Sequence, residues 1–347
     1  MTQATMTSLQ RVLTTLEHNE PDRVPFFLLL SMHGAKELNL SIKEYFSKAE
    51  NVVEGQLRLR EKYKHDNIYT FFYTGIEIEA MGGSVIFSKN EPPNTGTPII
   101  RDINQIKNLQ YISVKNSPDL NKVLQTTEQL KIKVGDDAPI IGVVMSPFSL
   151  PVMQLGFSTY IELMFEQAEL FNHLMKINEA FCIDWANAQL EAGATAIVYF
   201  DPVSSPTIIP KEKFIETGFE IGKRMISKIN GPVAIHHASG ISIPIADELS
   251  EMGAGIIGAS TNEDISDLKN TFKNKLTVLG NLNAVEMRRW SPKTTEDKVK
   301  EVIQKAGKGG GFVLADNHGE IPWQVPHEVL MAISNAVHKW GKYPLVQ

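Results

Sequence analysis

Residues 193–202 read GATAIVYFDP, and this stretch contains the pattern that decides the fold. Five consecutive apolar residues, 196–200, have the length of a strand that is covered on both faces. The Asp-Pro step that follows is typical of a turn. On either side, residues 158–191 and 211–228 have the length and mixed polarity of amphipathic helices. A buried strand between two helices is the repeating unit of a parallel α/β fold.

The same unit recurs along the chain. The predicted strands are residues 24–30, 67–73, 139–144, 196–200, 233–237, 255–259, 276–280 and 311–315. The predicted helices are residues 7–17, 42–64, 118–134, 158–191, 211–228, 243–252, 264–274 and 296–306. The alternating, Pro-Pro-containing stretch 83–101 is predicted to form a hairpin.

Eight strands without a GxGxxG motif after the first favour a closed barrel over a doubly wound open sheet. The sequence therefore predicts the α/β fold class and a single (β/α)8 TIM barrel. Residues 1–347 would form one domain, with an N-terminal helix and a decorating hairpin.

Composition excludes several classes of protein. The net charge is −6 and basic residues form no stripe, so nucleic acid is not an expected partner. No apolar run reaches the roughly 18 residues that span a bilayer, so we expect no membrane association. The chain's one cysteine, Cys182, rules out a disulfide framework within the chain and fits a reducing compartment. The start of the sequence lacks the apolar core of a signal peptide, so a cytoplasmic location is expected.

Histidines and acids follow the predicted strands at the end where such barrels place their active sites. His236 and His237 end the fifth strand, Asp201 follows the fourth, His318 follows the eighth and Glu79 follows the second. Imidazole and carboxylate are ligands for zinc and other divalent metals, which suggests a metal site at this rim. Each residue also has an ordinary alternative, such as a packed histidine, a turn aspartate or a solvated glutamate.

Four segments carry a resemblance to a known family. They are residues 7–26 (TSLQRVLTTLEHNEPDRVPF), 193–210 (GATAIVYFDPVSSPTIIP), 280–287 (GNLNAVEM) and 311–326 (GFVLADNHGEIPWQVP). In this order they resemble the uroporphyrinogen decarboxylase superfamily across essentially the whole chain. The resemblance implies the barrel fold of that superfamily.

The residues that serve decarboxylation in this superfamily are mostly replaced. No arginine lies between Arg23 and Arg58, where true decarboxylases have an arginine-rich segment. Their strand-two aspartate falls on Tyr73, their tyrosine falls near Met153, and only His318 matches. The resemblance therefore argues against porphyrinogen decarboxylation.

A second branch of the superfamily comprises zinc-dependent methyltransferases that work with corrinoid proteins. Residues 77–82 (EIEAMG) and the step from Asp201 to residue 202 resemble this branch. Its metal motif is a histidine, a cysteine two residues later and a second cysteine after strand eight. Here these positions are His236, Ala238 and His318. Imidazole and oxygen ligands leave more positive charge on a metal than thiolates do, which suits an oxygen or nitrogen leaving group.

The resemblance implies a methyltransferase that moves a methyl group from a phenyl methyl ether or a methylated amine to cobalt. Zinc is the expected metal, and a separate corrinoid protein is the expected partner. Two alternatives stay open: a methylcobamide:thiol (coenzyme M) methyltransferase, and a non-catalytic corrinoid or tetrapyrrole binding protein.

Site roles follow from this expectation. The predicted metal ligands are His236, His318 and Glu79, with Asp201, Asp316 and Glu263 as further candidates for the third ligand. The predicted acid–base residues are Glu79, Asp201 and His237, and the predicted substrate-binding residues are Tyr73, Phe148, Asp201 and Trp323.

Overall fold

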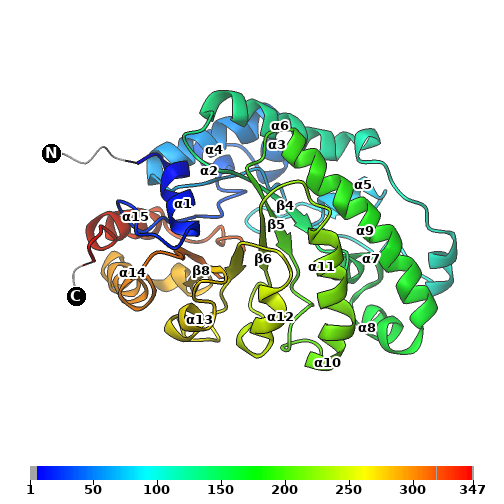
Figure 1. Cartoon of the computed structure of the whole chain (residues 1–347). Coiled ribbons are helices and arrows are strands. Elements are labelled where there is room, and N and C mark those ends of the chain that lie inside the picture. The colour runs from blue at the N-terminus through cyan, green and yellow to red at the C-terminus, as the bar shows by residue number, and fades with distance from the viewer. Residues whose placement is uncertain (1–5, 318, 346–347) are drawn as a thin grey trace.

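A curled parallel β-sheet forms the centre of the molecule. The computed structural model describes residues 6–317 and 319–345. Seven strands pair side by side in the order β1-β4-β5-β6-β7-β8-β9, and every pairing is parallel. Their bounds are β1 (Ile68–Tyr69), β4 (Ile140–Met145), β5 (Ala196–Phe200), β6 (Val233–His236), β7 (Ile256–Gly258), β8 (Thr277–Leu282) and β9 (Phe312–Asp316). In Figure 1 helices surround these strands, as strands buried on both faces require.

The predicted first strand is largely absent as a regular strand. Residues 24–30 contain one isolated parallel bridge, between Phe26 and Leu314 of β9. On its other side, the backbone N–H of Leu28 donates to the side-chain oxygen of Asn67 (3.1 Å). The side chain of Asn67 thus takes the place of the backbone carbonyl that would accept this N–H in a β-ladder. The prediction of a full strand at residues 24–30 was therefore wrong. The predicted strand 67–73 is likewise shortened, to β1.

Fifteen α-helices are assigned in the described residues. They are α1 (Ser8–Leu16), α2 (Gly34–Leu38), α3 (Ile42–Phe46), α4 (Ala49–Tyr63), α5 (Ile76–Ala80), α6 (Pro118–Val134), α7 (Pro151–Leu155), α8 (Phe157–Glu166), α9 (Ala168–Glu191), α10 (Lys211–Phe214), α11 (Glu220–Ile226), α12 (Ala246–Ser250), α13 (Ile265–Thr271), α14 (Pro292–Ala306) and α15 (His327–Trp340). Helical turns of other types are the 3-10 turns η1 (Ile103–Asn108), η2 (Val114–Asn116), η4 (Ile243–Ile245) and η5 (Glu286–Arg289) and the π-helical turn η3 (Ile215–Phe219). Within this part of the chain no helix is both long and apolar enough to cross a membrane.

Several helices differ from their predictions in extent. The stretch 42–64 is split into α3 and α4 because Lys48 has extended backbone angles (φ −139°, ψ 139°). The stretch 158–191 is split at Gln167, whose backbone leaves the helical region. Helix α15 was not predicted at all. The predicted hairpin is confirmed by the antiparallel pair β2 (Val85–Ile86) and β3 (Asn94–Thr95).

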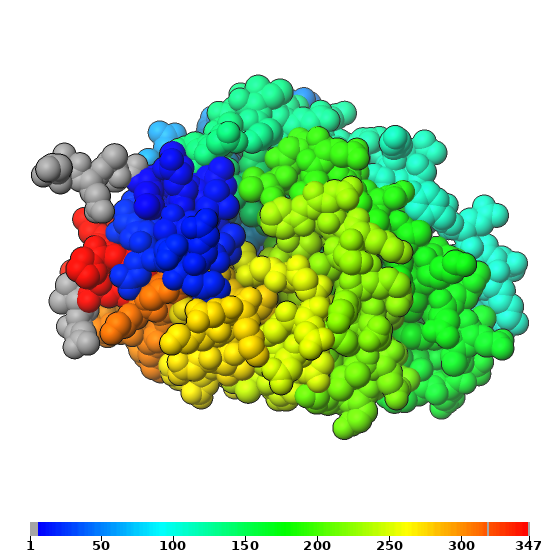
Figure 2. All heavy atoms as spheres, viewed as in Figure 1, coloured from blue at the N-terminus to red at the C-terminus, as the bar shows by residue number. Residues whose placement is uncertain are grey.

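A buried ionic cluster ties the two ends of the chain together. Asp66, which precedes β1 and is fully buried, accepts from Arg11 Nη1 (2.7 Å) and Arg23 Nη1 (2.6 Å). Arg11 also pairs with Asp22 at 2.6 Å. We call Arg11, Asp22, Arg23 and Asp66 the aspartate network. Arg23 in turn forms an antiparallel bridge with Lys342, and Figure 2 shows the N-terminal residues (blue) packed against the C-terminal ones (orange and red).

Candidate functional site

A cavity of about 260 Å³ opens at the carboxyl end of the sheet. Four of its polar or aromatic residues end strands: Tyr69 ends β1, Phe200 ends β5, His236 ends β6 and Asp316 ends β9. The other described residues that line it are Leu29, Tyr69, Phe71, Thr74, Pro92, Val143, Val198, Leu279, Ala315, Gly319 and Glu320. The cavity is therefore mostly apolar, with a few polar groups at its mouth, which is the usual composition of a small-molecule site.

His236 is held firmly by its neighbours. Its ring lies 5.7 Å from that of Phe200, centroid to centroid, and covers Gly258, where a Cβ atom would lie only 2.6 Å from the imidazole. A glycine at position 258 is thus required for this ring position. Nδ1 of His236 accepts the backbone N–H of Ala238 (3.0 Å), whose positive φ of 52° turns the chain back toward the ring. In the neutral imidazole the proton therefore sits on Nε2.

Two carboxylates line the same cavity. Glu320 Oε1 accepts the hydroxyl of Ser31 and the backbone N–H of Met32 (3.0 Å). Burial raises the pKa of Glu320 to about 7, and the nearby charge of Asp316 raises it further in the same direction. Asp316 Oδ2 accepts the backbone N–H of Gly319 (3.1 Å). Acids with raised pKa values in a cavity are typical of functional sites.

The predicted metal ligands are only partly brought together. His236 and Asp316 line the cavity, whereas His318 lies outside the described residues. Glu79 is not among the described lining residues, and its Oε2 accepts the hydroxyl of Tyr73 (2.6 Å).

Most predicted substrate contacts are instead core residues. Tyr73 is 2% exposed, and Phe148 is completely buried against Tyr160. Trp323 packs against His33 and lies under the ammonium group of Lys36. None of the three predicted aromatic residues lines the cavity.

Asp201 joins two loops rather than facing the cavity. It is completely buried, and its Oδ1 accepts the hydroxyls of Ser146 and Ser149, each at 2.6 Å. Burial raises its pKa to about 6, although the serine hydroxyls act against the rise. His237, the other predicted acid–base residue on this side, is 1% exposed, and burial lowers its pKa to about 3.

Sequence reasoning missed residues that do line the cavity. Glu320 lies in the segment 311–326 that carries the family resemblance, but it was given no role. Tyr69 and Phe71 were passed over in favour of residue 73, although the two-residue period of a strand puts 69 and 71 on one face. The period alone would put residue 73 on the same face, so it does not single out 69 and 71; β1 ends at Tyr69, and the chain then leaves the sheet.

The donor groups of the cavity fit a metal ion only in part. Among residues 6–317 and 319–345 no three His, Cys, Asp or Glu side chains are grouped to hold a metal. His236 and Asp316 fit a divalent metal as an imidazole and a carboxylate donor facing one cavity. A metal bound to Nδ1 of His236 would displace the Ala238 N–H from that nitrogen. A metal bound to Nε2 would leave the ring proton on Nδ1, which then could not accept the Ala238 N–H. Metal binding at His236 therefore requires the hydrogen bond from Ala238 to break.

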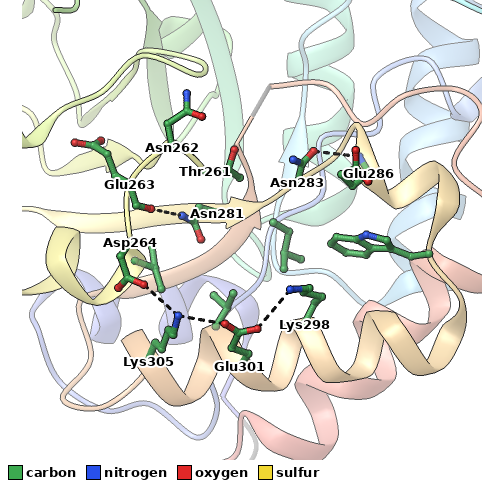
Figure 3. Close-up of a pocket in the computed structure, with 14 residues that line it drawn as sticks. Thr261, Asn262, Glu263, Asp264, Asn281, Asn283, Glu286, Lys298, Glu301 and Lys305 are labelled. Atoms are coloured by element: carbon green, nitrogen blue, oxygen red, sulfur yellow. Dashed lines mark hydrogen bonds and ion pairs between the residues drawn. The ribbon is translucent and has the colours of Figure 1, made fainter. Parts of the chain in front are cut away.

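A second hollow, of about 570 Å³, lies beside the sheet between the β7 and β8 loops and α14. Its charges are paired with one another: Lys305 contacts Asp264 and Glu301, each at 3.1 Å, and Lys298 lies 3.6 Å from Glu301 (Figure 3). Glu263, a further candidate for the third ligand, lines this hollow, and both its oxygens accept backbone N–H groups.

Comparison with known proteins identifies the family. The sequence profile of uroporphyrinogen decarboxylase (URO-D) matches residues 7–340. The methylcobamide:CoM methyltransferase MtaA of Methanosarcina barkeri is 26% identical over 93% of this chain and 95% of its own. A uroporphyrinogen decarboxylase of Carboxydothermus hydrogenoformans is 27% identical over 86% of this chain and 85% of its own.

Solved structures agree in fold. A methyltransferase from Methanosarcina mazei superposes with a TM-score of 0.81, at 20% identity, and covers 96% of this chain and 99% of its own. A B12-independent methionine synthase from Shewanella follows at a TM-score of 0.54 and 13% identity, covering 85% and 87% of the two chains. The profile match spans nearly the whole sequence, and the superposition on the Methanosarcina mazei methyltransferase spans nearly the whole fold. The chain belongs to the uroporphyrinogen decarboxylase family.

Proposed function

We propose that this protein is a methyltransferase that moves a methyl group from an O- or N-methylated small molecule to the cobalt of a corrinoid on a partner protein. The observation that carries the proposal is the lining of the cavity. Its described residues combine His236, Asp316 and Glu320 with apolar side chains and include neither lysine nor arginine. A porphyrinogen with many carboxylates needs cationic partners, so this lining favours methyl transfer over decarboxylation.

The size of the cavity supports a small substrate. At about 260 Å³ it lies near the lower end of ligand-binding cavities. The relatives named above include methyltransferases that match nearly the full length of the chain. A cytoplasmic location remains our proposal, on the strength of the chain's one cysteine.

We also propose that the sheet closes as an eight-stranded barrel through residues 24–30. Phe27 N donates to Leu314 O (2.8 Å) and Asp66 N donates to Phe26 O (2.9 Å), so this segment contacts both edges of the seven-stranded sheet. Closure would place residues 24–30 between β9 and β1 and would complete the wall of the cavity around Leu29.

For the metal, we propose His236 and His318 as ligands, with Asp316 as the carboxylate in place of Glu79. Asp316 lines the cavity and Glu79 does not. Zinc bound there would supply a Lewis acid for the heteroatom that carries the methyl group. Tyr69, Phe71 and Phe200 would hold the donor. We assign an indirect role to the three residues that do not line the cavity, Glu79, Asp201 and His237. They would hold the loops at the carboxyl end of the sheet in place.

A methyl-transfer assay tests the proposal. Purified protein is mixed with cob(I)alamin and a series of methyl ethers and methylamines, and methylcobalamin is followed by its absorbance. We expect methylcobalamin to form from at least one donor. Methylation of thiols from methylcobalamin alone would favour the coenzyme M reaction instead. Absence of both activities, together with no stoichiometric metal, would favour a non-catalytic binding protein.

The ligand assignment is tested by His236→Ala. We expect loss of bound zinc and a fall in turnover of at least about 100-fold, because ligands matter at least as much as the groups that orient them. The control is His173→Ala on the exposed surface of α9. This variant should keep both the bound zinc and the turnover of the native protein. Full activity in His236→Ala would remove His236 from the site.

A further inference from the structure

The hairpin that follows α5 reaches the cavity from outside the seven-stranded sheet. Its strands β2 and β3 are joined by residues 87–93, and Pro92 of this turn lines the cavity. Every other described lining residue lies on a strand of that sheet, in the segment 24–30, or within five residues of the end of such a strand. Pro92 is therefore a part of the cavity wall that a separate element supplies.

Glycines stand at both ends of the hairpin. It begins with Gly82 and Gly83 and closes at Gly96, whose backbone N–H donates to the oxygen of Ser84 (2.8 Å). Gly82 has a φ of 84°, and a Cβ atom there would meet nothing within 4 Å. Backbone conformation, rather than crowding, thus favours glycine at this position. Residues of this kind at the ends of an element commonly absorb the backbone change of a hinge.

Few contacts hold the turn over the cavity. The side chain of Gln324, after β9, donates from Nε2 to the backbone oxygen of Asn90 (2.9 Å). The ring of Phe87 packs edge-on against Tyr73, with 5.5 Å between the ring centroids. In the part of the chain that the structure describes, residues 88–92 make no ion pair and no other hydrogen bond. A segment with so few contacts opens more readily than the sheet beneath it.

We propose that residues 82–96 form a lid, with Gln324 as its latch, that shuts over a bound small molecule and opens to let a large reaction partner reach it. A cavity of about 260 Å³ holds a small methyl donor but not a corrin macrocycle, so cobalt must approach from the mouth. The shut lid keeps water from the donor until the partner arrives. The part that the corrinoid plays here rests on the proposed function, whereas the lid itself does not.

A thiol inside the cavity tests the lid without any enzymatic reaction. Val143→Cys places it on the cavity wall, and the native Cys182 is completely buried. In this background, Gln324→Leu removes the latch and should speed labelling by a fluorescein maleimide about fivefold, the effect of one hydrogen bond. The control Gln304→Leu, at an exposed position on α14, should leave the rate unchanged. Equal labelling rates with and without the latch would overturn the proposal. Val198→Cys, on the same wall, repeats the measurement should Val143→Cys not fold.

Holding the lid shut tests whether it must open. The full-length double variant Asn90→Cys, Gln324→Cys is bridged with bis(maleimido)ethane. Its matched control is the same double variant blocked with N-ethylmaleimide, which cannot bridge two thiols. Bridging should slow methylcobalamin formation from cob(I)alamin at least about tenfold relative to the blocked protein, because cobalt reaches the donor only past the open lid. A bridged protein as fast as the blocked one would refute the lid.

The lid and the proposed function fail in different ways. Labelling that depends on the latch, without methyl transfer to cob(I)alamin from any donor, would refute the function and keep the lid. Methyl transfer at equal rates in the bridged and the blocked protein would keep the function and refute the lid.

Discussion

The two ends of the sheet treat buried acids in opposite ways. At the amino end, Asp66 is enclosed by two arginines and a serine. Burial alone would raise the pKa of Asp22 there, but Arg11 and Arg23 outweigh it and hold that pKa below its usual value. At the carboxyl end, burial raises the pKa of Glu320 and of Glu77 to about 7. Acids with arginine partners lie at one end of the sheet, and acids whose pKa is raised by burial lie at the other.

The contrast shows which buried charges stabilise the fold: those with a buried partner of opposite charge. The guanidinium groups of Arg11 and Arg23 reach Asp66 directly, and Asp66 Oδ2 also accepts the backbone N–H of Phe26 (3.0 Å). A site that must accept a ligand cannot be filled in this way. There, burial raises the pKa of Glu320.

The largest predicted effect is at the amino end. Asp66→Asn leaves two buried arginines without their main partner and should lower the free energy of unfolding by about 3–5 kcal/mol. Urea denaturation measures it. The control Asp137→Asn removes an exposed partner of Arg60 and should cost about 0–1 kcal/mol. A loss below 1 kcal/mol in Asp66→Asn would contradict the claim that the arginine-paired acid at the amino end stabilises the fold.

At the carboxyl end, removing the charge of a buried acid should raise the free energy of unfolding rather than lower it. Glu77 is 3% exposed and accepts the N–H of Met145, and burial raises its pKa from 4.5 to about 7. Stability from this raised pKa is fully present below about pH 4.5 and is lost as the pH rises to about 7. Glu77→Gln should therefore be more stable than the native protein by about 2 kcal/mol at pH 8 and no different at pH 4.

Thermal or urea unfolding of Glu77→Gln at both pH values measures this. Glu54→Gln, at an exposed ion pair with Arg58, serves as the control and should change stability by about 0.5 kcal/mol or less at either pH. Destabilisation of Glu77→Gln at pH 8 would show that the charge of Glu77 is favourable where it lies.

The smallest effect compares two serines. Ser149 donates to Asp201 and accepts the N–H of Val203 (3.1 Å), so Ser149→Ala should cost about 1–2 kcal/mol. Ser8 donates to Asp66 (3.0 Å), which keeps its arginines, so Ser8→Ala should cost about 0.5 kcal/mol. Urea denaturation of both variants ranks them. The reverse order would mean that the hydroxyls around Asp201 are dispensable.

Strong local patterns predicted several elements well. Residues 196–200 form a strand and 118–134 form a helix, because an apolar run before Asp-Pro and a Ser-Pro helix start are local signals. Residues 24–30 were apolar enough for a strand, but Asn67 replaces backbone pairing by a side chain, which periodicity does not reveal. The rim prediction placed His236 and Asp316 correctly at strand ends.

The sequence alone determined the order of strand and helix, the family and the collection of acids and histidines at one rim, since each depends on local pattern or motif. The tertiary structure decided which of those acids reach the cavity. Glu79 turns to Tyr73 and Asp201 to two serines, whereas Glu320 faces the ligand space. The physical reason is that a side chain's partners come from other loops, and their distances are set only when the sheet curls and the loops pack.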